Sequence, residues 1–303
     1  NDLGGSLYVL SSSIFFDGTI IFHNNTASSG RAVYAGGSSM FWWDGSVEFD
    51  NNLGIFGGAL FVLGSNVSSS GNMTLAHNRA SGHGAASGGA LWLSGGSRVS
   101  WSGESMFNNN SALGFGGAAF VSWDAILNWS GDTTFMNCAA SFGGALFVVN
   151  GSGRFNPRSS PLVINGSTIF ANNTAGATGG GLALNGMLSV SFQSSDVLFI
   201  GNSADVVGGA VFVSSFGVGP VFSAVQFVAN FAGAGGGAYV TGSGNEEINA
   251  FDTTPAYATR FDGCRFVDNL ATSTGGAIDS VAGQDHISNT IFMGKAADVG
   301  GAL

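Results

Sequence analysis

The feature that most constrains this chain is a repeat of about 30 residues. In each copy a Phe is followed three residues later by an Asn, and then, after a short variable step, by Gly-Gly-Ala and an apolar run, as in Phe107–Val121. The first position of the ten copies falls at Phe22, Phe49, Leu75, Phe107, Phe135, Phe170, Phe199, Phe227, Phe266 and Phe292. The nine intervals between them cover 270 residues, a mean of 30. Such a period indicates a solenoid, in which each unit buries its apolar face against its neighbours.

Composition favours strands over helices as the repeating element. The 303 residues include 51 Gly and only 8 Lys plus Arg, and Thr, Val and Phe are frequent, which disfavours helices. The segment Gly57–Asn78 is typical of three short strands separated by Gly, Ser and Asn turns. One such turn of chain stacked on the next is a parallel β-helix, in which each coil advances about 4.8 Å and ten coils form a rod of roughly 50 Å.

Stacked coils place equivalent residues above one another, so two internal columns are predicted. The first position forms a ladder of nine Phe and one Leu, each stabilising the fold by about 1.5 to 3 kcal/mol through burial. The Asn position predicts a second ladder, because a side-chain amide carries both donors and an acceptor and bonds to the amides above and below. This column reads Asn25, Asn52, Asn78, Asn110, Cys138, Asn173, Asn202, Asn230, Asn269 and Lys295.

The paired FxxN and Gly-Gly-Ala motifs resemble the repeats of the chlamydial polymorphic outer-membrane proteins, which also occur in surface proteins of some eukaryotic microbes. Both motifs recur along the whole chain, with Gly-Gly-Ala at Gly57, Gly88, Gly116, Gly143, Gly208, Gly236, Gly275 and Gly300. The resemblance implies an all-β fold, a right-handed parallel β-helix of about ten coils with three short strands each. It also implies display outside a cell, often as an adhesive passenger.

We expect residues 1–303 to form a single β-helix domain. Leu3–Val9 reads as a Gly-Gly-Ala strand with no FxxN before it, and Gly300–Leu303 ends inside the same element. Because an open end of a solenoid is an unpaired strand edge, two alternatives follow. The chain is a segment of a longer solenoid, or it is a subunit that associates with other copies end to end or laterally.

Charge and cysteine content limit the partners. The net charge of -10 and the lack of a basic cluster argue against nucleic acid. The sequence contains no run of 18 apolar residues, so we expect no membrane-spanning helix. Cys138 and Cys264 lie four copies apart, roughly 19 Å, whereas a disulfide requires Cα atoms within about 7 Å. We therefore expect two unpaired, buried cysteines in an extracellular protein.

Two rows of side chains alternate along the strand that begins at Gly-Gly-Ala. One row is aliphatic, as at Leu60 and Leu91, and the other is largely aromatic. If the aliphatic row faces inward, the aromatic row forms an external stripe that marks an interface with a neighbouring solenoid, a packed-back loop of the same chain, or flat sugar faces. In the alternative the aromatic row fills the core. The candidate interface stripe is Tyr8, Tyr34, Phe61, Trp92, Phe120, Phe147 and Phe212.

Sequons for N-linked glycans form the second set of candidate sites. They occur at Asn24, Asn66, Asn72, Asn109, Asn128, Asn150, Asn165 and Asn172. Asn72 and Asn165 precede the inward Phe position by an odd number of residues, so we expect them to point outward. Asn24, Asn109 and Asn172 adjoin ladder positions and are expected to be more buried.

The chain carries no recognisable catalytic constellation. Other β-helices cleave pectins with clustered carboxylates, but the carboxylates here are mostly turn residues, and no metal spacing, phosphate loop or nucleophile elbow occurs. We therefore expect that the protein is not an enzyme and binds no cofactor or metal ion. The favoured function is a structural stalk or filament subunit carrying glycans. The alternatives are an adhesin that binds a host surface or a polysaccharide, for which the insertion Thr241–Phe261 is one candidate region, and a carbohydrate-active enzyme.

Overall fold

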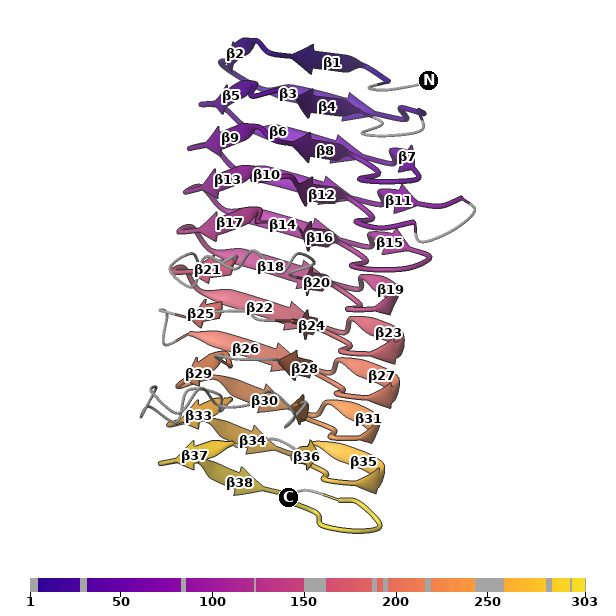
Figure 1. Ribbon diagram of the computed structural model, residues 1–303, viewed down its shortest axis with the longest axis vertical. Coiled ribbons are helices and arrows are strands. Elements are labelled where there is room, and N and C mark those ends of the chain that lie inside the picture. Colours follow the sequence, from indigo (N-terminus) through magenta and orange to yellow (C-terminus); the bar gives the residue numbers. More distant parts are fainter. Residues whose placement is uncertain are drawn as a thin grey trace, which may run out of the picture.

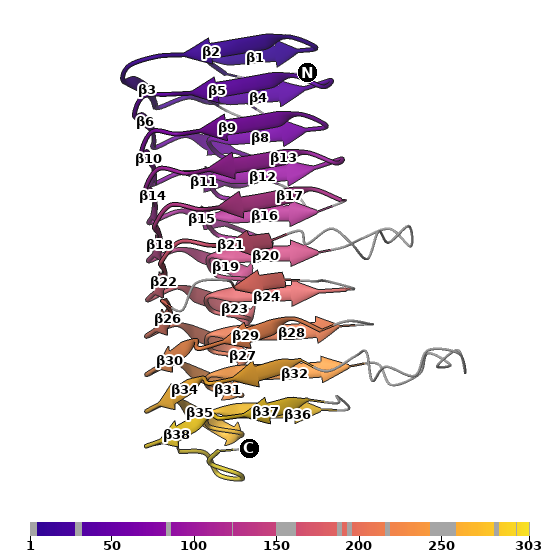
Figure 2. The ribbon, with the colours of Figure 1, turned by 90° about the vertical axis from the view of Figure 1, so that its left-hand side faces the viewer.

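Each repeat folds into one coil because its apolar runs are separated by residues that tolerate a sharp change of direction. In the computed structural model these coils stack along one axis, and the strands of successive coils pair in parallel (Figures 1 and 2). The structure describes residues 5–27, 32–82, 86–122, 124–149, 162–186, 190–192, 196–215, 219–242, 259–281, 285–294 and 296–302. All regular elements in this part are strands.

Three sheets of ten strands each form the body of the rod. The Gly-Gly-Ala sheet consists of β1 (Leu7–Leu10), β4 (Val33–Gly36), β8 (Leu60–Leu63), β12 (Leu91–Ser94), β16 (Ala119–Ser122), β20 (Leu146–Val149), β24 (Leu182–Asn185), β28 (Val211–Ser215), β32 (Ala238–Gly242) and β36 (Ile278–Val281). The middle sheet consists of β2 (Ser13–Phe16), β5 (Met40–Trp43), β9 (Asn66–Ser69), β13 (Arg98–Trp101), β17 (Ile126–Trp129), β21 (Leu162–Ile164), β25 (Val190–Phe192), β29 (Val221–Ser223), β33 (Arg260–Asp262) and β37 (His286–Ser288). The Phe sheet consists of β3 (Ile20–His23), β6 (Val47–Asp50), β10 (Met73–Ala76), β14 (Ser105–Asn108), β18 (Thr133–Met136), β22 (Thr168–Ala171), β26 (Val197–Ile200), β30 (Gln226–Val228), β34 (Arg265–Val267) and β38 (Ile291–Met293).

A fourth sheet of eight strands stands beside this body, on the right of Figure 1. We call it the fin sheet. Its strands are β7 (Leu53–Gly54), β11 (Arg79–Ala80), β15 (Ser111–Ala112), β19 (Ala139–Phe142), β23 (Thr174–Thr178), β27 (Ser203–Val207), β31 (Phe231–Ala234) and β35 (Leu270–Thr274). The prediction of three strands per coil is thus wrong for these coils, which have four. Buried alanines fill the fin, in two small clusters around Ala80 and Ala204.

The predicted Phe ladder is the spine of the core. Phe107, Phe135 and Phe170 are 0% exposed, and their rings stack with centroids 4.7 and 4.8 Å apart. The stack continues to Phe292 through similar contacts, and Leu75 takes the same register between Phe49 and Phe107. Identical rings lie above one another because the parallel strands pair without a shift.

The predicted Asn ladder is also present, and its amides are hydrogen-bonded from coil to coil on both sides of Cys138. Asn78 Oδ1 accepts the backbone N–H and the side-chain amide of Asn52, at 3.0 and 2.9 Å. Asn78 Nδ2 donates to Asn110 Oδ1 and to the carbonyl of Phe49. The pattern recurs from Asn173 to Asn269. A buried amide whose donors and acceptor are all paired escapes the desolvation cost of an unpaired polar group.

The Gly-Gly pair is required by the return from the fin sheet to the next coil. Gly116 has φ +62°, in the left-handed region that favours glycine. Gly117 packs so tightly that a Cβ would lie 2.0 Å from the carbonyl oxygen of Gly144. The first Gly therefore supplies a conformation, and the second leaves room for the neighbouring coil.

Phe135→Ala tests the spine. It should lower the free energy of unfolding by about 3 to 5 kcal/mol, because it empties a fully buried aromatic site. Chemical denaturation followed by circular dichroism measures the change. Thr134→Ala, at a half-buried, outward-facing position on the same strand, is the control, and a loss below about 1 kcal/mol for Phe135→Ala would mean that the ring is not interior.

Cys138→Asn tests the Asn ladder. Cys138 occupies a ladder position, so Asn173 Oδ1 accepts only its backbone N–H, at 2.9 Å, without a side-chain amide. Asparagine would restore this bond and raise the free energy of unfolding by about 1 kcal/mol. An equal loss, measured in the same denaturant titration, would contradict the ladder geometry at this coil.

Candidate functional site

The outer surface carries few titratable groups in contact with one another. Asp50 lies between two histidines, with its carboxylate oxygens 3.0 Å from His23 Nδ1 and 2.8 Å from His77 Nδ1. This row continues to Asn109, whose amide lies 3.4 Å from His77 Nε2. Within the described ranges, no three His, Cys, Asp or Glu side chains are grouped in a way that would hold a metal ion.

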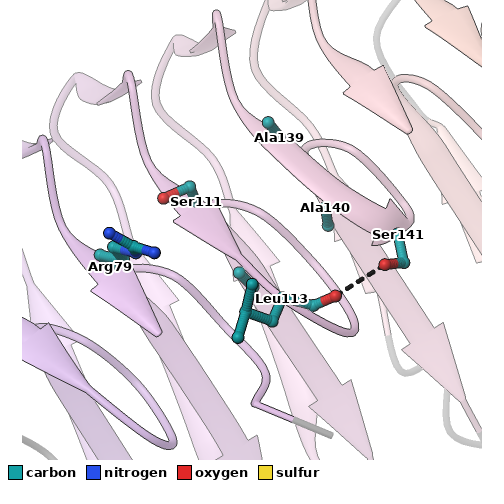
Figure 3. Close-up of a pocket in the computed structure, with 7 residues that line it drawn as sticks. Arg79, Ser111, Leu113, Ala139, Ala140 and Ser141 are labelled. Atoms are coloured by element: carbon teal, nitrogen blue, oxygen red, sulfur yellow. Dashed lines mark hydrogen bonds between the residues drawn. The ribbon is translucent and has the colours of Figure 1, made fainter. Parts of the chain in front are cut away.

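A groove on the fin sheet contains a charged group (Figure 3). It measures about 350 Å³ and is lined by Arg79, Ser111, Ala112, Leu113, Ala139, Ala140 and Ser141. Small side chains on β15 and β19 leave the space, and the Ser141 hydroxyl donates to the Leu113 carbonyl, at 2.6 Å, across neighbouring coils.

The charge in this groove comes from Arg79. Its side chain is exposed and has no carboxylate partner in the described part of the chain. Guanidinium groups bind carboxylate and phosphate groups through paired hydrogen bonds. The groove can therefore receive an acidic group or a polar, hydroxyl-rich one over a floor of Ala and Ser.

This groove was not predicted from the sequence because the fin sheet was not predicted. A signal was nevertheless present. Phe56, Phe115 and Phe142 each stand directly before a Gly-Gly pair, and they share one register in the return strand of the fin. A repeated Phe at this position indicates that the step between Asn and Gly-Gly is extended and packed rather than a free loop.

The aliphatic row faces inward and the aromatic row lies on the outer face of the Gly-Gly-Ala sheet. Val33, Leu60 and Leu91 are 0% exposed and belong to the main core. The aromatic rings form a stack of their own, with centroid distances of 4.2 to 6.1 Å, in the order Tyr8, Tyr34, Phe61, Trp92, Phe120 and Phe147. Phe212 stacks on Tyr239 further along the same row.

The fin covers part of the aromatic row. The Phe115 ring lies 4.7 Å from Phe147, and the Phe56 ring lies 6.1 Å from Trp92. Tyr34, Phe61 and Phe147 are only 8%, 7% and 5% exposed, whereas Tyr8 is 47% exposed. A packed-back segment of the same chain thus meets part of this row, of which Tyr8 is exposed and Trp92, Phe120 and Phe212 are half-buried.

Most sequon asparagines lie on the outer surface. Asn66, Asn72 and Asn165 are exposed. The expectation that Asn24, Asn109 and Asn172 are more buried is wrong, because these corner residues have φ between 53° and 57° and are exposed beside the buried ladder. Asn128 is half-buried, with a carbonyl oxygen that lacks a hydrogen bond. Asn150 lies outside the described residues, as does most of the insertion Thr241–Phe261.

Both cysteines are unpaired and buried. Cys138 Sγ lies 3.4 Å from the Met136 carbonyl, and Cys264 Sγ lies 3.4 Å from the Phe222 carbonyl. Burial raises the pKa of the Cys138 thiol to about 12 and that of the Cys264 thiol to about 11. Neither thiol is therefore a nucleophile at neutral pH.

The fold defines the chain as a parallel β-solenoid built from FxxN and Gly-Gly-Ala repeats. The family model of the Chlamydia polymorphic membrane protein repeat matches residues 196–214, which contain Phe199, Asn202 and the Gly208–Gly209 pair. This match confirms the resemblance that the motifs predicted. No curated protein and no solved structure matches the chain. Fold and repeat together indicate a surface-associated β-helical protein, and no helix in the described ranges is long and apolar enough to cross a membrane.

Thiol accessibility tests the burial of the cysteines. At pH 8 the native protein should not react with a disulfide reagent such as Ellman's over hours, because both thiols are buried and protonated. Unfolding in guanidinium should release both for reaction, which gives the total. Prompt reaction of one thiol in the native protein would contradict the packing of its coil.

Proposed function

We propose that the chain is a non-enzymatic structural rod of an extracellular surface, a stalk or filament subunit whose outer faces carry N-linked glycans. The observation that carries this proposal is the continuity of the two internal ladders. In the described residues, Phe stacking and Asn hydrogen bonding link coil to coil, with Leu75 as the exception in the Phe column and Cys138 in the Asn column; Lys295, the last position of the Asn column, lies outside these residues. A solenoid held together in this way resists bending and keeps what it carries at a fixed distance.

The chemistry of the surface supports a structural role. The groove on the fin sheet is lined mostly by small residues, and carboxylates bond to neutral side chains, as Asp262 does with Ser288 and Asn289, or to histidines, as Asp50 does. Exposed sequons occur on several faces, so glycans would surround the rod. Copies that associate end to end would continue the parallel pairing of the sheets from one copy to the next.

Antibody labelling of intact source cells tests the location. An antibody raised against the purified chain should label cells without permeabilisation, and electron microscopy of the native material should show extended rods. Mass spectrometry of that material should find glycans on exposed sequons. Labelling that requires permeabilisation, or only short particles that do not associate, would contradict the proposal.

Removal of one coil tests the rod itself. Ser105 pairs with Thr133, so excision of residues 105–132 joins two equivalent positions. The variant should fold and be shorter by about 4.8 Å, as measured by small-angle scattering or electron microscopy. Excision of residues 105–118, half a coil, is the matched control and should not fold, because it moves Phe and Asn out of register.

The second candidate function is adhesion, which the fin groove favours. Its unpaired Arg79 and small floor residues offer a place for an acidic or hydroxyl-rich group of a host surface or a polysaccharide. Arg79→Ala should weaken cell or polysaccharide binding if the groove is used, whereas deletion of Thr241–Phe261 should abolish binding if that insertion is used. Binding unchanged by both variants would leave the structural role alone.

A further inference from the structure

A second groove, on the outer face of the middle sheet, contains one of the sequons. It measures about 300 Å³ and is lined by Met40, Phe41, Trp42, Asn66, Val67, Ser68, Arg98 and Ser100. These residues belong to β5, β9 and β13, three successive strands in Figure 2. Both the asparagine and the hydroxyl residue of the sequon Asn66-Val67-Ser68 therefore line the same hollow.

The groove arises from a change in side-chain size along one column. Phe15, Trp42, Ser68 and Ser100 occupy equivalent positions in four successive coils. Phe15 and Trp42 project from the sheet and are 62% and 40% exposed, whereas the two serines are short. This step leaves a shallow seat beside Trp42, with Met40, 41% exposed, on the same strand.

The polar groups of the seat are free. Within the part of the chain that the structure describes, no hydrogen bond engages the side chains of Asn66, Ser68, Arg98 or Ser100, and Arg98 has no carboxylate partner. Asn66 is exposed, so its Nδ2 is accessible. Met40 is its direct neighbour across the strand pair, and Trp42 is its diagonal neighbour, a separation that long side chains span.

We propose that Asn66 is glycosylated and that the first sugar of its glycan is seated in this groove, against Trp42 and Met40. In the modification, Asn66 Nδ2 forms a bond to C1 of an N-acetylglucosamine as the C1–O bond to a lipid-diphosphate donor breaks, and Nδ2 loses one proton. One face of such a sugar presents C–H groups, which pack on a flat apolar side chain. Its hydroxyl and acetamido groups are hydrogen-bond partners for Arg98, Ser68 and Ser100.

The covalent bond explains why so shallow a groove suffices. A free sugar would lose translational freedom on binding, whereas a tethered one has a high effective concentration over the seat. The seated sugar would also cover the exposed side chains of Trp42 and Met40. The inference rests on the proposed extracellular, glycosylated rod, and it assigns one sequon a role that the others lack.

Asn72 provides the matched control. It is an exposed sequon asparagine in the same coil, between β9 and β10. Its Oδ1 accepts the backbone N–H of Glu104 at 3.1 Å. Its neighbours across the strand pairs are Ser46 and Glu104, and neither of them offers an aromatic ring to a sugar. A glycan on Asn72 should be solvent-exposed in the same molecule.

The test uses the full chain secreted from a eukaryotic host. Glycopeptide mass spectrometry first measures occupancy at Asn66 and Asn72. The native protein is then treated with a peptide N-glycosidase, and release is followed at each site. Trp42→Ser should speed release at Asn66 about fivefold, the factor that corresponds to roughly 1 kcal/mol of ring packing, and leave release at Asn72 unchanged. Met40→Ser should act in the same direction, which guards against a folding defect in one variant.

Two results would overturn the inference. Asn66 left unmodified while Asn72 is occupied would show that the sequon is not used, although the glycosylated rod would stand. Release at Asn66 that neither variant alters, with circular dichroism unchanged, would show that the sugar does not occupy the seat. Absence of glycans at every sequon would contradict the glycan part of the proposed function as well.

Discussion

The structure depends on the in-register stacking of identical side chains between coils. In the three main sheets each strand pairs with the next without a shift, so Phe meets Phe and Asn meets Asn along the ladders, except at Leu75 and Cys138. The Phe spine removes apolar surface from water. The Asn ladder provides hydrogen-bond partners for the buried backbone groups at the corner where the chain leaves the Phe sheet. One register thus serves both packing and hydrogen bonding, and a slip of one residue would lose both.

The core was predictable from the sequence because each of its two main columns repeats one residue type, Phe or Asn, at a regular interval. A Phe every 30 residues and an Asn three positions later have no common explanation other than stacking. The fin sheet was not predicted, because strands such as β11 and β15 contain only two residues, with Ala, Ser and Arg, and lack an alternating apolar pattern. Missing the fin had a second effect. The sequence left open whether the aromatic row faces inward or outward, and although a packed-back loop was one possible partner of this row, its cover by Phe56 and Phe115 was not predicted.

The sequons of the described residues and the grooves lie on the outer faces of the rod. The corners that expose Asn24, Asn109 and Asn172 exist because the residue before each ladder Asn adopts a left-handed conformation, which Asn tolerates. Sequons therefore arise beside the ladder itself, and their burial could not be judged from alternation alone. Steps in side-chain size along a column, as from Trp42 to Ser68, create shallow seats on otherwise flat faces.

Pairwise distances between spin labels test the stacking most directly. Glu48, Ile169 and Arg265 occupy one outward column of the Phe sheet, with Ile169 four coils and Arg265 seven coils from Glu48. Labels at cysteines introduced in pairs at these positions, with both native cysteines replaced by alanine, should lie roughly 19 and 34 Å apart, increasing by about 4.8 Å per coil. Distances that do not grow in proportion to the number of coils would contradict the ladder and the rod built on it.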